Sequence, residues 1–192
     1  MTRDEVVLQR PEDIHLLLGV FHTDNACCGA ASAYLLRRIA YRAGAFAPGI
    51  QEELFYELAT TRDGGSLDKV QRWFDGRVAT LHSLGYRLQC RRLAMPTAAV
   101  LDWVKAGRGY RGAMLPTTFN KLHPEIAEDR VAHAVGLTVD RLDAKADEDL
   151  VMIDPWPGSA AGRDRVKVPA ALEQAHRDHN YHGLAFFWTG WS

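Results

Sequence analysis

The pattern of apolar and polar positions divides the chain into two halves of different character. In the first half, apolar residues recur three or four positions apart, which is the period of a helix with one buried face. Ile50, Leu54 and Leu58 have this spacing. The pattern predicts helices over residues 26–43, 50–60, 66–74 and 98–105, a short helix over 81–85, and a strand over 86–93.

The second half contains apolar runs of strand length. Polarity alternates over residues 131–139, which places His133 on the same face as the apolar side chains of an expected strand. A polar run separates this strand from a second apolar run over 150–153. Further strands are predicted over 113–115 and 184–188, a loop over 107–112, an irregular rim segment over 116–130 and a short helix over 169–176. A helical first half followed by a β-rich second half predicts an α+β protein.

The first predicted helix has well-marked ends and an unusual beginning. Asp24 and Asn25 are good N-cap residues, and Gly44 marks the C-terminal end. The first two turns consist almost entirely of small residues, which usually allow other backbone to approach closely. Cys27 and Cys28 lie at the N-terminus, where the helix dipole favours the thiolate and lowers the pKa of a thiol. This position predicts a nucleophilic thiol.

Composition and charge exclude several classes of protein. The chain has 192 residues, of which 47% are hydrophobic and 24% are charged, and its net charge is −1. This balance is typical of a soluble globular protein and offers no basic surface for nucleic acid. The sequence has no run of about 18 apolar residues, and residues 1–13 lack the apolar core of a signal peptide. We therefore expect no nucleic-acid or membrane partner and a cytoplasmic location.

The three cysteines fit neither a disulfide framework nor a zinc ribbon. Their number is odd, two of them are adjacent, and the sequence has no CxxC pair. Cys90 falls within a predicted strand, and we expect it in the core. His176, His179 and His182 are spaced three residues apart, which suits one face of a helix only partly. We expect no metal and no cofactor.

A thiol nucleophile needs a base, and the base needs a group that orients it. If strands over 131–139 and 150–154 pair as a hairpin centred near residue 144, the numbers of opposed residues sum to about 287 or 288. His133 and Asp154 satisfy this sum. The hairpin therefore predicts an aspartate close enough to hold the histidine ring. The order Cys, His, Asp along the chain is that of papain-like enzymes.

Four segments in this order resemble the motifs of one family. Residues 22–32 (HTDNACCGAAS) contain a Cys-Gly that opens a small-residue helix, and residues 60–68 (TTRDGGSLD) resemble a Gly-Thr-Ser-Leu loop. Residues 133–136 (HAVG) resemble a histidine strand, and residues 153–156 (IDPW) resemble an Asp-Pro motif. Together they resemble the papain-like cysteine peptidase superfamily, and within it the bacteriocin-processing, or double-glycine leader, peptidases.

The resemblance implies a fold and a set of residue roles. The fold would be one papain-like domain over 1–192, with a buried central helix in a helical lobe over about 1–95, packed against an antiparallel sheet lobe over about 96–192. The active site would lie in the groove between the lobes. Cys28, which precedes the Gly, would be the nucleophile, and His133 and Asp154 would be its base and the orienting acid. The expected cleft residues are Asp24, Asn25, Cys27, Gly29 and Trp156.

One position departs from the family pattern. The family has a Gln six residues before the nucleophile, whose side chain donates to the oxyanion, and this chain has His22 there. An imidazole can also donate a hydrogen bond, so His22 is the expected oxyanion donor. The same departure favours the alternative that the site has lost its activity.

The function expected from these residues is acyl transfer through a thioester on the cysteine. Transfer to water would make a peptidase or amidase, and transfer to an amine or thiol would make an acyltransferase. The expected partner is a peptide or an acyl-carrying substrate. The alternatives are a catalytically degenerate peptide-binding module and a deamidase or protease effector. The sequence does not indicate the oligomeric state.

Overall fold

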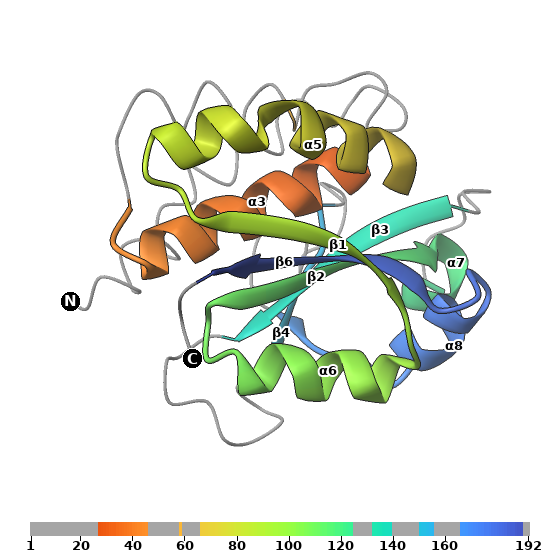
Figure 1. Ribbon diagram of the computed structural model, residues 1–192. Helices are drawn as coiled ribbons and strands as arrows, with labels where there is room; N and C mark the ends of the chain where they lie inside the picture. The colour runs from red at the N-terminus through yellow and green to blue at the C-terminus, as the bar shows by residue number, and fades with distance from the viewer. Residues whose placement is uncertain are drawn as a thin grey trace.

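Figure 1 shows the computed structural model, which describes residues 27–45, 58, 66–124, 132–139, 150–155 and 166–189. These residues form a six-stranded sheet of order β1-β6-β2-β3-β4-β5, in which every neighbouring pair is antiparallel. Helices pack on the sheet, so the prediction of an α+β protein is confirmed. The strands are β1 (Leu88–Ala94), β2 (Arg111–Thr118), β3 (Ala132–Val139), β4 (Leu150–Ile153), β5 (Val166–Lys167) and β6 (His182–Trp188).

Helices cover both faces of the sheet. The two longest, α3 (Cys27–Arg42) and α5 (Leu67–Ser83), lie on one face, and α6 (Thr97–Ala106) and α8 (Leu172–Arg177) lie on the other (Figure 1). The short α7 (Phe119–Leu122) follows β2 directly and contacts α8. Successive side chains of a strand point to opposite faces. On β6, Leu184 and Phe186 therefore join the core beneath α3 and α5, whereas Ala185 joins the core beneath α6.

The central helix of the first core is α3, which lies close to the sheet because its first turns are small and buried. Leu35 is fully buried opposite Gly112 on β2 and Gly136 on β3. A Cβ atom at Gly136 would lie 3.3 Å from the side chain of Leu35, so the glycine makes room for the leucine. Arg38 donates to the backbone carbonyl of Val139 at 2.6 Å. These contacts fix α3 against β3, the strand that carries His133.

The helix α5 begins as predicted but continues further. Ser66 caps it, and the Ser66 hydroxyl accepts a hydrogen bond from the backbone N–H of Lys69 at 3.3 Å. The separate short helix predicted over 81–85 is wrong, because α5 runs without a break to Ser83. Leu81 is buried on the same face as the apolar residues of the earlier turns, which keeps the chain helical. Gly85, at φ +88°, ends it.

The strands also differ in extent from the prediction. The strand predicted over 113–115 is β2, which is eight residues long and takes in the start of the rim segment predicted over 116–130. The sheet begins before residue 96, since β1 pairs with β6, and helices cover both of its faces. The described residues therefore do not separate at residue 95 into a helical lobe and a sheet lobe.

Two further predictions concern the helices. Of the helix predicted over 50–60, Leu58 is described, and it is buried in the core beneath α3; the rest lies outside the described residues. Among the helices that the structure describes, none has both the length and the apolar character needed to cross a membrane.

Candidate functional site

The two adjacent cysteines begin α3, at the helix end where unpaired N–H groups and the helix dipole favour negative charge. Cys27 is half-buried, and its thiol hydrogen-bonds with the thiol of Cys28 and with the side chain of His133. The bond from Cys28 lowers the pKa of Cys27 most, and His133 and the backbone N–H of Cys28 lower it further against the effect of burial. The pKa of Cys27 consequently lies well below that of an ordinary thiol.

The neighbouring thiol of Cys28 has the opposite character. Cys28 is 4% exposed and belongs to the core beneath α3. Its hydrogen bond to Cys27, together with burial, raises the pKa of Cys28 well above the ordinary value. Two adjacent thiols cannot both carry charge at low cost, and the one that lies beside the histidine is Cys27. Of the two thiols, Cys27 is therefore the one that ionises more readily.

The histidine of this site is His133, near the start of β3. Its ring is 7% exposed, and Nε2 lies 2.7 Å from Oδ1 of Asp154. Burial alone would lower the pKa of His133, but the hydrogen bonds to Asp154 and Cys27 raise it to about 9. Because Nε2 is engaged by the carboxylate, Nδ1 is the ring nitrogen left to face the thiol. The imidazole thus stands between an acid and a thiol.

The predicted proximity of His133 and Asp154 is present, although the predicted register is not. In the structure Gly136 pairs with Ile153 and Val139 pairs with Leu150, so the numbers of opposed residues sum to 289. Asp154 follows the end of β4 and lies diagonally across from His133 rather than directly opposite. Diagonal neighbours on one face of a sheet remain within reach of long side chains, which preserves the contact.

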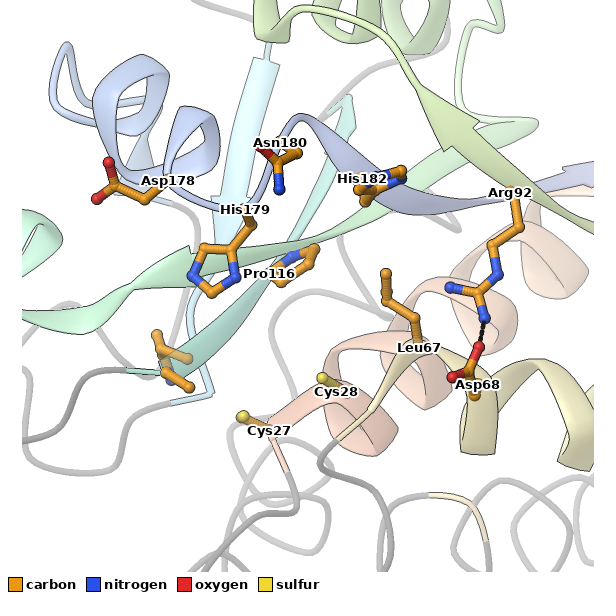
Figure 2. Close-up of a pocket in the computed structure, with 12 residues that line it drawn as sticks. Cys27, Cys28, Leu67, Asp68, Arg92, Pro116, Asp178, His179, Asn180 and His182 are labelled. Atoms are coloured by element: carbon orange, nitrogen blue, oxygen red, sulfur yellow. Dashed lines mark hydrogen bonds and ion pairs between the residues drawn. The ribbon is translucent and has the colours of Figure 1, made fainter.

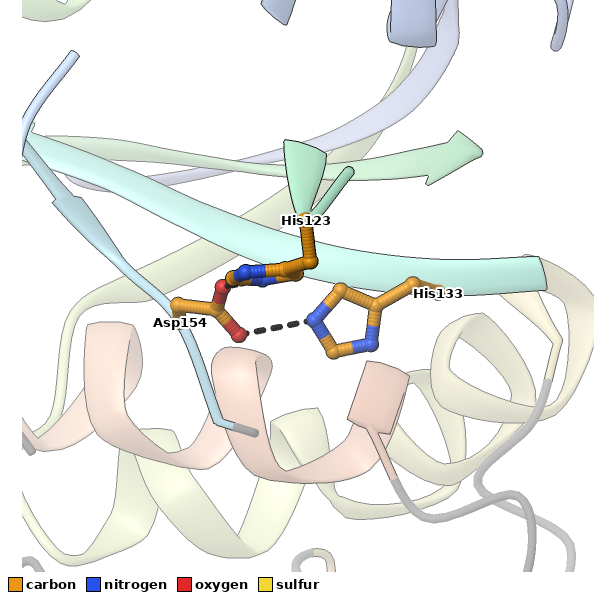
Figure 3. A group of neighbouring side chains, drawn as sticks. All are labelled: His123, His133 and Asp154. Carbon is orange, nitrogen blue, oxygen red and sulfur yellow. Dashed lines mark hydrogen bonds and ion pairs between the residues drawn. The ribbon is translucent and has the colours of Figure 1, made fainter. Parts of the chain in front are cut away.

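A second histidine, which no sequence pattern indicated, shares the same carboxylate. His123 follows α7, and its Nε2 lies 2.5 Å from Oδ2 of Asp154 (Figure 3). All three side chains are nearly excluded from solvent. The residue lies within the segment expected to form a substrate rim, and the sequence offered no signal beyond that position. Its contact depends on how α7 places it above β4.

The donor types of His123, His133 and Asp154 are also those that bind zinc or iron, and their ligand atoms lie within 4.8 Å of one another. Two ligands about 2.0–2.1 Å from one tetrahedral ion stand about 3.3 Å apart. The nitrogen-to-oxygen distances of 2.5 Å and 2.7 Å are shorter and match hydrogen bonds to an ionised carboxylate. The geometry fits a hydrogen-bonded carboxylate better than a metal centre.

Cys27, Cys28 and His133 line a pocket of about 590 Å³. Figure 2 shows the two sulfur atoms on one side and, across the pocket, the turn that carries His179 and Asn180. An ion pair between Arg92 of β1 and Asp68 of α5 lies beside it. The remaining lining residues are Leu67, Pro116, Ala132, Asp178 and His182.

The turn across the pocket is held in an uncommon backbone conformation. Asn180 and Tyr181 have φ values of +54° and +58°, a region that non-glycine residues seldom adopt. The Tyr181 hydroxyl donates to Glu173 at 2.7 Å and accepts from Arg177 at 3.0 Å. Thr118 donates to Asp178 at 2.8 Å. These bonds tie the turn to α8 and β2. The turn therefore forms a fixed wall of the pocket, opposite the two cysteines.

The structure describes only some of the other residues predicted from the sequence. His22, Asp24, Asn25 and Trp156 lie outside the described residues. Gly29 is buried in α3 beside the cysteines, and Cys90 is half-buried, with its thiol 3.5 Å from the amide oxygen of Gln71.

The three C-terminal histidines do not converge on one point. His176 is buried and bonds through Nδ1 to Thr97 and through Nε2 to the carbonyl of His182. His179 and His182 line the pocket instead. The pairing of His176 with a hydroxyl and a carbonyl accounts for its burial without a ligand.

No match to this chain was found among family models, curated proteins or solved structures.

Proposed function

We propose that this protein is a thiol-dependent acyl-transfer enzyme, a papain-like cysteine peptidase, amidase or acyltransferase whose nucleophile is Cys27. The observation that carries the proposal is the continuous chain of contacts from the Cys27 thiol through His133 to Asp154, beside a pocket. A nucleophile, a base and an orienting acid in hydrogen-bond contact are the parts that acyl transfer needs. The papain-like assignment of the fold belongs to the same proposal.

In the proposed reaction, His133 holds the proton of the Cys27 thiol as an imidazolium. The thiolate sulfur attacks the carbonyl carbon of a peptide or acyl-carrying substrate, and the carbon–sulfur bond forms. The bond between the carbonyl carbon and the leaving amine nitrogen or thiol sulfur then breaks, and the imidazolium gives its proton to that leaving group, which leaves a thioester on Cys27. Water, an amine or a thiol attacks the thioester, His133 takes its proton, and the thiolate leaves.

The backbone supports this chemistry at the helix end. The backbone N–H of Cys28 hydrogen-bonds to the sulfur of Cys27, so the first turn of α3 already stabilises negative charge there. An oxyanion formed beside Cys27 would meet the same positive helix end. His22, the predicted side-chain donor, lies outside the described residues and remains part of the proposal.

The choice between the cysteines departs from the family resemblance. The Cys-Gly order favours Cys28, whereas the contacts with His133 and the divergent pKa values favour Cys27. The geometry favours Cys27, because both thiols line the pocket but Cys27 alone contacts His133, whereas Cys28 is nearly buried and its pKa is raised.

Iodoacetamide labelling tests the proposal. At about pH 6, where a free thiol is almost entirely protonated, mass spectrometry of the digested protein locates the modified cysteine. We expect rapid modification at Cys27, loss of that rapid phase in Cys27→Ala, and its retention in Cys28→Ala, the matched control.

Two other results are informative. A rapid phase that disappears only in Cys28→Ala would identify Cys28 as the nucleophile. If every cysteine reacts no faster than free cysteine, the protein has no activated nucleophile, and a peptide-binding module describes it better. Incubation of the reactive protein with a peptide mixture would separate a peptidase from a deamidase, because each leaves a different mass change.

A further inference from the structure

The carboxylate of Asp154 is shared between two imidazole rings. Oδ1 lies 2.7 Å from Nε2 of His133, and Oδ2 lies 2.5 Å from Nε2 of His123. An ionised carboxylate only accepts hydrogen bonds, so both Nε2 atoms donate to it. Figure 3 shows both rings directed at the same carboxylate, with His133 on the side of α3. The proposed mechanism uses only one of these two bonds.

Packing holds the ring of His123 in place. Its backbone N–H bonds to the carbonyl of Phe119 at 2.9 Å, which closes the last turn of α7. The fully buried ring of Phe119 lies 4.8 Å from the ring of His123 and 5.2 Å from that of His133. One aromatic side chain thus contacts both histidines. The position of His123 is set by α7 and that of His133 by β3, so Asp154 joins two separate elements.

We propose that His123 is a positioning residue, which holds the Asp154 carboxylate so that its other oxygen meets His133. This inference rests on the proposed function, since it concerns the same triad. Asp154 is 2% exposed, and a buried carboxylate oxygen without a donor is costly. Without the N–H of His123, the carboxylate turns toward another donor or takes up a proton. Either change weakens the bond that keeps His133 charged.

The experiment compares two substitutions that differ in reach. His123→Gln keeps an amide N–H near the position of Nε2, whereas His123→Asn is shorter by one methylene and leaves Oδ2 without that donor. His176→Gln is the control, because it alters a second buried histidine on another element. The readouts are the NMR titration of the His133 ring, with ¹⁵N-labelled histidine, and the rate of Cys27 alkylation at about pH 6. Both are measured on the full chain.

In the wild type, we expect His133 to titrate with a pKa of about 9. In His123→Asn, we expect the pKa to fall toward the ordinary 6.5 and the alkylation rate to fall about tenfold, as is common when a group that orients a ligand is lost. We expect His123→Gln to stay within about twofold of the wild-type rate, a small change for a variant that keeps the donor. The His176→Gln protein should keep the wild-type titration of His133.

Three results would overturn the inference. The first is an unchanged or higher pKa of His133 in His123→Asn, and the second is an equal loss in the Asn and Gln variants. The third is uptake of one zinc ion by the wild type that either substitution abolishes, which would make His123 a metal ligand. Slow alkylation of the wild-type Cys27 would instead contradict the proposed function, and the titration of His133 would still test the role of His123.

Discussion

The substitution Asp154→Asn tests the triad most directly, because asparagine has nearly the shape of aspartate without its charge. The pKa of His133, about 9 against an ordinary 6.5, corresponds to roughly 3 kcal/mol in favour of the charged ring, at 1.36 kcal/mol for each factor of ten. The ring is almost fully buried, so solvent screens little of this interaction. The interactions with Asp154 and with Cys27 together raise the pKa of His133. If Asp154 supplies about 2 kcal/mol, its loss lowers the equilibrium constant for forming the thiolate–imidazolium pair about 30-fold.

The assay is the rate of iodoacetamide alkylation of Cys27 as a function of pH, together with the ultraviolet absorbance of the thiolate. We expect Asp154→Asn to alkylate more slowly near pH 6, by up to about 30-fold, and to approach the wild-type rate at high pH, where any thiol ionises. Asp75→Asn is the matched control, because Asp75 is exposed on α5 and bonds to Gln71. A change of less than about threefold in Asp154→Asn would refute the reasoning, because the shared pKa shift requires a larger effect.

Two further predictions concern stability. Because the folded-state pKa of His133 is raised, its contribution to stability is complete below about pH 6.5 and is lost as the pH rises through about 9. Urea unfolding should therefore show a stability difference between wild type and Asp154→Asn that narrows from pH 6 to pH 9.5; a constant difference would contradict the assigned pKa. Gly136→Ala should destabilise the protein by about 1–3 kcal/mol, because the new Cβ would press on Leu35. Gly76→Ala, where nothing lies within 4 Å, should be neutral or stabilising by up to about 1 kcal/mol in the same measurement.

Much of the fold follows from local patterns. The end of α3 near Gly44, the cap at Ser66 and the strand that carries His133 each depend on neighbouring residues, and each is present. The proximity of His133 and Asp154 also follows, because a short polar connection between two strands limits their register to a few choices. The register itself was missed by one or two residues, and the contact persisted because long side chains also reach diagonal neighbours.

The choice between Cys27 and Cys28 could not follow from the pattern. Adjacent residues of a helix point about 100° apart, so only one of the two can face β3. The apolar periodicity that normally fixes the rotation of a helix is weak where every residue is small, as in the first turns of α3. The rotation is set further along, where Leu35 packs against the glycines of the sheet. The contact of His123 with Asp154 could not be predicted for a related reason, because it depends on where α7 packs.

One cysteine is nearly buried directly beside the proposed nucleophile, so the labelling rates of the two adjacent thiols report different events in the protein. Cys28 also lines the pocket, but it is 4% exposed and packs in the core beneath α3, so local opening at the start of α3 would speed its reaction with a thiol reagent. Cys27 lines the pocket and, if the proposed function is correct, reacts without such opening. Pulse labelling of these two adjacent residues would therefore report two rates: the chemistry of the site at the sulfur of Cys27, and local opening at the start of α3 at the sulfur of Cys28.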